Sequence, residues 1–104
     1  MRMMMKVSIP VESGNAAIAN GTLGKTIQSI LGEIKPEAAY FVAEDGRRTA
    51  YLFLDMTQSS QLPALAEPFF LAFNAAISVS PAMSLEDLGA AGPGIEHAVK
   101  TYNK

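Results

Sequence analysis

The sequence predicts one α+β domain over residues 1–104, built in the order β-α-β-β-α-β and followed by a helical tail. Two patterns support this prediction. Apolar residues alternate along several short segments, as in half-buried strands, and they recur every three or four residues between them, as in amphipathic helices. An Asp-Gly pair between two apolar runs adds a strong hairpin signal. A chain of 104 residues fits one domain of ordinary size.

The first strand and helix are expected in the first third of the chain. Residues 3–9 alternate between apolar and polar positions, and Pro10 should end this strand. Residues 13–15, Ser-Gly-Asn, are typical of a turn with helix-capping chemistry. The helix is expected at residues 23–34, where apolar side chains form one stripe, with a stop before Pro36. Its start stays open, because an Asn-Gly pair precedes it.

Residues 38–56 predict a β-hairpin centred on Asp45-Gly46, a dipeptide preferred in type I′ turns. A two-residue loop fixes the register of the two strands. The expected cross-strand pairs are Glu44–Arg47, which is charge-complementary, Val42–Thr49 and Tyr40–Tyr51.

A second helix is expected at about residues 60–73. Ser59 or Ser60 can cap it, Pro63 falls in the tolerant first turn, and Pro68 should kink its interior.

The last part of the chain predicts a strand and two helical segments. Residues 76–83 alternate again, and residues 84–87 resemble a capping box that opens a short helix. Glycines at 89, 92 and 94 should interrupt that helix, and a final helix should include residues 95–102.

This order of elements is the ferredoxin-like pattern, a four-stranded antiparallel sheet with both helices on one face and the first and third strands central. The helix-side face of the sheet should be aliphatic; it comprises Met5, Val7, Ile9, Ala39, Phe41, Ala50, Leu52, Leu54, Ile77 and Val79. The opposite face should mix rings with polar groups; it comprises Lys6, Ser8, Tyr40, Val42, Thr49, Tyr51, Phe53, Asp55, Ser78 and Ser80.

The ring-bearing face predicts self-association. Left in water, its aromatic side chains would form an apolar patch unusual for a soluble monomer. Burying one ring of ~150 Å² stabilises by at most about 4 kcal/mol. We therefore expect two sheets to pack face to face in a homodimer. Lys6 and Asp55 would then need polar partners or a wet cavity.

The chain resembles the small domains that pair into dimeric α+β barrels, and among them bacterial proteins of about this length with no assigned role. The likeness lies in residues 6–10 (Lys-Val-Ser-Ile-Pro), 51–55 (Tyr-Leu-Phe-Leu-Asp) and 79–83 (Val-Ser-Pro-Ala-Met), the last leading into Glu86-Asp87. Enzymes of this superfamily include muconolactone isomerase and cofactor-independent or haem-degrading monooxygenases. The resemblance implies a fold and a cavity, and no particular reaction.

Composition argues against several classes of function. A formal net charge of -2 does not suit a nucleic-acid-binding face, and the lack of Cys excludes disulfides and thiolate metal sites. The Met-rich start lacks the apolar core of a signal peptide, and no apolar run reaches membrane-helix length, so we expect a soluble cytoplasmic protein. Residues 24–26 are the Gly-Lys-Thr that ends a P-loop, but the first glycine of that motif would fall at position 19, which is Ala19. We expect no metal and no cofactor.

The candidate site lies on the ring-bearing face. Asp55 is the candidate catalytic residue, because a carboxylate in a partly apolar cavity has a raised pKa and can act as a base; a solvated or Lys6-paired carboxylate is the alternative. The candidate ligand-binding residues are Tyr40, Tyr51, Phe53 and Lys6; the alternative for the two tyrosines is a role as cross-strand packing partners. His97 lies off the apolar stripe of the last helix and should be solvated.

Two functions remain in competition. The first is a homodimeric domain that binds a small organic ligand between its sheets or only stabilises the dimer. The second is a cofactor-independent isomerase or monooxygenase-like enzyme for a small organic acid or aromatic, in which Asp55 moves a proton. The absence of Cys, and of any histidine besides His97, favours the first.

Overall fold

An antiparallel sheet of four strands, in the order β2-β3-β1-β4, organises the molecule in the computed structural model, which describes residues 1–103. The strands are β1 (Arg2–Ile9), β2 (Ala38–Glu44), β3 (Arg47–Asp55) and β4 (Ala76–Pro81). The prediction that the first and third strands are central is confirmed. The registers of β1 with β3 and β4 separate the apolar residues from the ring-bearing ones as expected.

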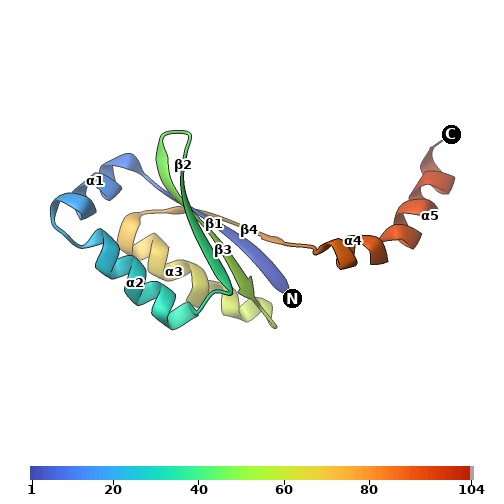
Figure 1. Cartoon of the computed structure of the whole chain (residues 1–104), viewed down its shortest axis with the longest axis horizontal. Helices are drawn as coiled ribbons and strands as arrows, with labels where there is room; N and C mark the ends of the chain where they lie inside the picture. The colour runs from blue at the N-terminus through green and yellow to red at the C-terminus, as the bar shows by residue number, and fades with distance from the viewer. Residues whose placement is uncertain (104) are drawn as a thin grey trace.

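Three helices lie on one side of the sheet (Figure 1): α1 (Val11–Ala19), α2 (Leu23–Ile34) and α3 (Leu62–Phe73). A short 3₁₀ turn, η1 (Ser59–Gln61), leads into α3. Two more helices, α4 (Leu85–Ala90) and α5 (Gly92–Tyr102), follow the sheet. The order fits the ferredoxin-like pattern in part, because the first crossover holds two helices where the sequence predicted one.

The turn predicted at residues 13–15 is wrong, because these residues lie inside α1. Pro10 occupies the N-cap position, so the chain passes from β1 almost directly into the helix. A Cβ atom at Gly14 would lie 2.8 Å from Nη1 of Arg48 and 3.3 Å from Cγ2 of Ile9. Glycine therefore lets α1 approach the end of the sheet. The hydroxyl of Ser13 donates to the carbonyl of Phe73 at 2.6 Å, which ties α1 to the end of α3.

Helix α2 has the predicted bounds and ends at Ile34, where Lys35 takes a left-handed conformation with φ 48° before Pro36. The predicted serine cap of α3 is wrong. Residues 59 and 60 lie in η1, which Gln58 and Gln61 cap reciprocally. The long side chains of Gln58 and Gln61 reach across this turn, whereas the prediction rested on the preference of serine for helix N-caps. Pro68 lies inside α3, and the helix continues beyond it to Phe73.

The hairpin matches its prediction in every cross-strand pair. Asp45 and Gly46 both have positive φ, 53° and 73°, as a type I′ turn requires. The capping box at the start of α4 is also confirmed, since the amide of Asp87 donates to Oγ of Ser84 at 3.1 Å and the reciprocal bond is 3.0 Å. Helix α4 is short and ends at Ala90, as predicted, although Gly89 lies inside it. Gly92 begins α5, and Pro93 sits in its first turn, where a missing amide hydrogen costs little.

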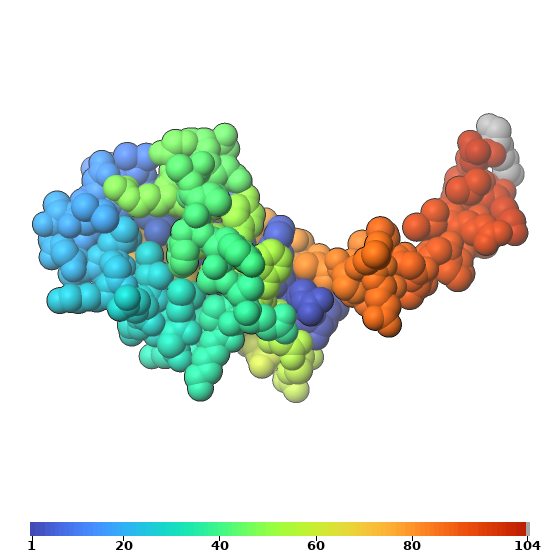
Figure 2. All heavy atoms as spheres, viewed as in Figure 1, coloured from blue at the N-terminus to red at the C-terminus, as the bar shows by residue number. Residues whose placement is uncertain are grey.

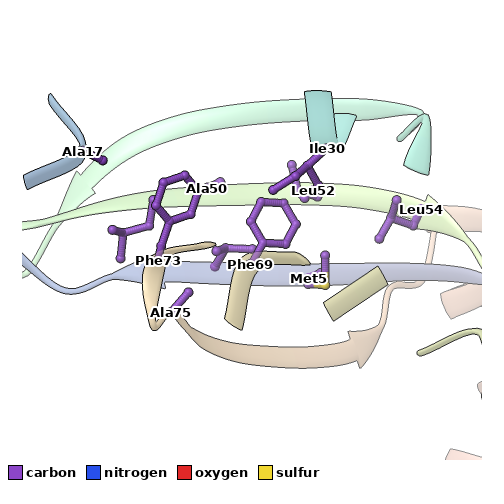
Figure 3. Packing of buried hydrophobic residues seen from close by; sticks show 11 residues of the cluster. Met5, Ala17, Ile30, Ala50, Leu52, Leu54, Phe69, Phe73 and Ala75 are labelled. Atoms are coloured by element: carbon purple, nitrogen blue, oxygen red, sulfur yellow. The ribbon is translucent and has the colours of Figure 1, made fainter. Parts of the chain in front are cut away.

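The core lies between the sheet and the helix layer, where side chains of the central strands meet those of α1, α2 and α3 (Figure 3). Phe69 and Phe73 of α3 pack over the central strands, and Met5, Val7 and Leu52 are the most deeply buried large side chains. Burial on β1 alternates residue by residue from Met3 to Ile9. Alternation of this kind fixes which face of the sheet is the core.

Beyond β4 the chain forms an arm, defined here as residues 82–103, which extends away from the sheet and the helix layer (Figures 1 and 2). The radius of gyration is 17.4 Å, whereas a compact chain of this length has a value of about 13 Å. The principal extents of 58 × 28 × 21 Å show the same elongation. Within residues 1–103, none of the helices is both long and apolar enough to cross a bilayer.

Candidate functional site

The open face, meaning the side of the sheet opposite the three helices, brings most of the predicted site residues together. Strand register places Lys6 directly opposite Tyr51, and Tyr51 directly opposite Tyr40. Phe53 follows two residues later on β3, on the same face. The predicted ligand-binding residues therefore form one row across three neighbouring strands.

Two of these rings form an aromatic pair. Tyr40 and Phe53 meet edge to face, with ring centroids 6.3 Å apart and an interplanar angle of 78°. They are diagonal neighbours across β2 and β3, a separation that aromatic side chains can span. Tyr40 is 61% exposed, although aromatic surface is among the most favourable to bury. The pair thus presents a rigid apolar surface to the outside of this chain.

A polar cluster lies beside the aromatic pair and centres on Glu44. The Tyr51 hydroxyl donates a hydrogen bond to Oε1 of Glu44, and the Lys6 ammonium forms an ion pair with Oε2. All three side chains are partly exposed. The sequence did not predict Glu44 as part of this cluster. In the strand register Glu44 lies opposite Arg47, which is four residues away from Tyr51 along β3. The contact depends on the twist of the hairpin, which a flat register does not show.

Electrostatics fixes the protonation of this cluster. The hydrogen bond that Tyr51 donates to Glu44 is the main cause that raises the pKa of the Tyr51 hydroxyl. The hydrogen bond from Lys6 to Glu44 is likewise the main cause that raises the pKa of the Lys6 ammonium. The hydrogen bonds from Lys6 and then Tyr51 lower the pKa of the Glu44 carboxyl. At neutral pH, Lys6 is therefore charged, Glu44 is ionised and Tyr51 keeps its proton. A hollow of about 260 Å³ adjoins Lys6 and Glu44 and includes Arg47 and Ser78.

Asp55 lies apart from this cluster. It ends β3, its side chain is 61% exposed, and it accepts a hydrogen bond of 2.9 Å from the Met1 ammonium. Four residues separate it from Tyr51 along the strand, a distance of about 13 Å. Lys6 pairs with Glu44 and not with Asp55. Asp55 borders two hollows with partly apolar walls, which include Ile34 and Leu65 in one and Pro81 and Met83 in the other. His97 is exposed on α5, as predicted.

An apolar hollow lies on the helix side of the sheet, whereas the sequence placed a cavity between two ring-bearing faces. This apolar groove, of about 390 Å³, runs between α2 and the hairpin strands β2 and β3. Its walls include Leu23, Ile27 and Leu31 of α2, Phe41 of β2, and Phe69 of α3. Phe41 is 56% exposed, because α2 leaves the outer edge of β2 uncovered. The helical stripe alone could not show how far α2 reaches across the sheet.

No protein-family model and no curated protein matches the chain. Among solved structures, the chain is similar to a formyltetrahydrofolate deformylase from Pseudomonas putida KT2440, with 13% sequence identity and a TM-score of 0.48. The match covers 79% of this chain and 29% of that one, so this chain spans less than a third of the enzyme's length. The fold defines the class, a small α+β domain, and the function has to be inferred from the chain's own residues.

The carboxylate of Glu44 and the ammonium of Lys6 affect the pKa of Tyr51 in opposite directions, which allows the arrangement of the cluster to be tested. In Glu44→Gln the pKa of Tyr51 should fall, because the carboxylate that holds its proton is gone. In Lys6→Met the pKa of Tyr51 should rise, because the Lys6 charge lowers it. Ultraviolet titration of tyrosine ionisation measures both, with Tyr51→Phe subtracted to assign the signal. Shifts of the same sign in the two variants would contradict the arrangement.

Proposed function

We propose that this protein is a homodimeric binding domain, in which the open faces of two sheets pack together and enclose a small organic ligand. The observation behind the proposal is the Tyr40–Phe53 pair, in which Tyr40 is exposed and Phe53 is half-buried, on a face that no helix of the described chain covers. An aromatic surface of this kind favours association. Pairing across a two-fold axis would bring two copies of the row together.

The polar cluster indicates the chemistry of the ligand. Lys6 remains positively charged, and its ammonium has more donors than its bond to Glu44 uses. Tyr40 and Phe53 supply apolar surface beside it. A small carboxylic acid with an aromatic or branched apolar body satisfies both features, because its carboxylate would meet Lys6 while its body contacts the rings. A pocket with few polar groups among apolar ones is the usual form of such sites.

Binding is favoured over catalysis by the protonation of the cluster. A general base works best with a pKa near the working pH. Here Glu44 is a weakened base, since its pKa is lowered, and the raised pKa values of Lys6 and Tyr51 hold their protons. The isomerase or monooxygenase-like reaction through Asp55 stays a prediction, and Asp55 stands in an exposed ion pair away from the cluster.

Replacing Tyr40 with Glu tests the pairing of the faces. The charge would have to enter the interface, so the dissociation constant of the dimer should rise at least about tenfold, which corresponds to about 1.4 kcal/mol. Leu71→Glu is the control, because Leu71 is 81% exposed on α3, on the helix side. Sedimentation equilibrium measures the dissociation constant of the full chain.

Native mass spectrometry of the same proteins tests the ligand. We expect a dimer that retains a small molecule, and we expect Lys6→Met to lose that molecule while it keeps the dimer mass. A chain that stays single at high concentration, or a Tyr40→Glu variant that associates as tightly as Leu71→Glu, would overturn the pairing of the faces.

A further inference from the structure

We propose that the arm of one chain docks in the apolar groove of a second copy of this chain. The proposal concerns a different surface from the open face and stands on its own observations. It joins two features of the described chain that have no partner within it: an apolar stripe on the arm and an apolar groove on the domain.

The arm carries large apolar side chains along both of its helices. In α5, Ile95, Val99 and Tyr102 recur at i, i+4 and i+7, and they are 55%, 51% and 81% exposed. In α4, Leu85 and Leu88 are 87% and 49% exposed. Neither helix has a buried residue, and within the described chain their substantial packing is with each other. An amphipathic helix of this kind obtains most of its stability from packing its apolar face.

The groove is the complementary surface. Its walls are aliphatic and aromatic almost throughout, and it lies open along the uncovered edge of β2. A helix that lays residues spaced at i, i+4 and i+7 into an apolar groove is a recurrent mode of recognition. Charge supports the match as well. Arg48 is the charged residue lining the groove, whereas the arm carries Glu86 and Asp87 in addition to its Glu96–Lys100 ion pair.

The geometry directs the arm to another copy. The arm leaves β4 beside Met3, where the pairing of β1 with β4 ends at Pro81. The amide of Ala82 donates to the carbonyl of Arg2 at 3.0 Å, so the hydrogen bonding between the two chain segments continues one residue beyond β4. The groove lies along β2, at the edge of the sheet opposite β4. It extends toward the end of the sheet that holds Ile9 and Arg48, away from the end where the arm begins. Figure 1 shows α5 on the far side of the molecule from α2.

Cysteine cross-linking tests the docking directly, because the chain has no cysteine of its own. Full-length Val99→Cys and Phe41→Cys chains are mixed and mildly oxidised, and the products are identified by mass. We expect a disulfide-linked pair with one chain of each kind. His97→Cys is the control, because its side chain leaves α5 on the face opposite Val99; with Phe41→Cys it should give at least about tenfold less product.

A second variant guards against cross-links from random encounters. Val99→Glu should raise the dissociation constant of the dimer at least about tenfold relative to His97→Glu, and both sites are exposed, so the fold should be unchanged. The proposal is overturned by equal cross-linking of the two arm positions, by an intrachain disulfide in the Phe41→Cys/Val99→Cys double variant, or by wild-type association of Val99→Glu. A small molecule found in the groove without the mixed disulfide also overturns it. Failure of Tyr40→Glu to weaken the dimer would reject the pairing of open faces and leave the docked arm intact.

Discussion

Replacing Phe69 with Ala should lower the free energy of unfolding by about 3–5 kcal/mol. Phe69 is 2% exposed and packs from α3 onto the central strands (Figure 3). Truncation removes the transfer free energy of the ring and leaves a cavity that close-packed neighbours fill only in part. A domain of this size has a total stability of about 5–15 kcal/mol, so the variant should lose a large part of it. Urea denaturation followed by circular dichroism measures the change.

The adjacent phenylalanine provides a matched control. Phe70 follows on the same helix but is 40% exposed. Its replacement by Ala should cost about 1 kcal/mol or less, since surface changes are usually small. Equal losses for the two variants would contradict the packing of α3 against the sheet.

Replacing Leu52 with Asp should prevent the domain from folding. Leu52 has an exposed fraction of 0% in the middle of β3. The change loses about 1.5–3 kcal/mol of apolar burial and adds the cost of a buried, unpaired carboxylate, which amounts to several kcal/mol. Together these terms rival the whole stability of a small domain. The far-ultraviolet circular dichroism spectrum should be that of an unfolded chain.

Phe53→Asp separates the two faces of the sheet. Phe53 is the next residue along β3 but lies on the open face, beside Tyr40. The variant should keep a folded spectrum and instead weaken self-association, as expected for Tyr40→Glu. If Phe53→Asp unfolded the chain and Leu52→Asp did not, the assignment of the core face would be reversed.

The sheet could be predicted from the sequence because its signals are local and periodic. The Asp45-Gly46 turn sets the hairpin register without help from the rest of the chain, and a period of two then assigns each residue to a face. Helix α2 was found for a similar reason, since its apolar stripe is long and regular.

The errors arose where tertiary contact decides the local structure. The Ser-Gly-Asn segment has the composition of a turn, but it lies inside α1, where Gly14 is buried close to Arg48 and Ile9. The Glu44–Tyr51 hydrogen bond needs the twist of the hairpin, and the groove beside Phe41 needs the position of α2 over β2. The spacing of residues along one helix or strand does not reveal these contacts between elements.

The strand order also governs how this protein can be made. The first strand, β1, lies between β3 and β4, which follow it along the chain. During synthesis, one hydrogen-bonding edge of residues 2–9 therefore stays open until residues 47–55 have left the ribosome, and the other edge stays open until residues 76–81 have done so. Among the strand pairs, the β2–β3 hairpin can form without help from distant residues, because its contacts are local. The β1 strand, which is apolar on one face, thus stays unpaired for longer than the other strands, and a chaperone that covered it would guard the nascent chain against edge-to-edge association.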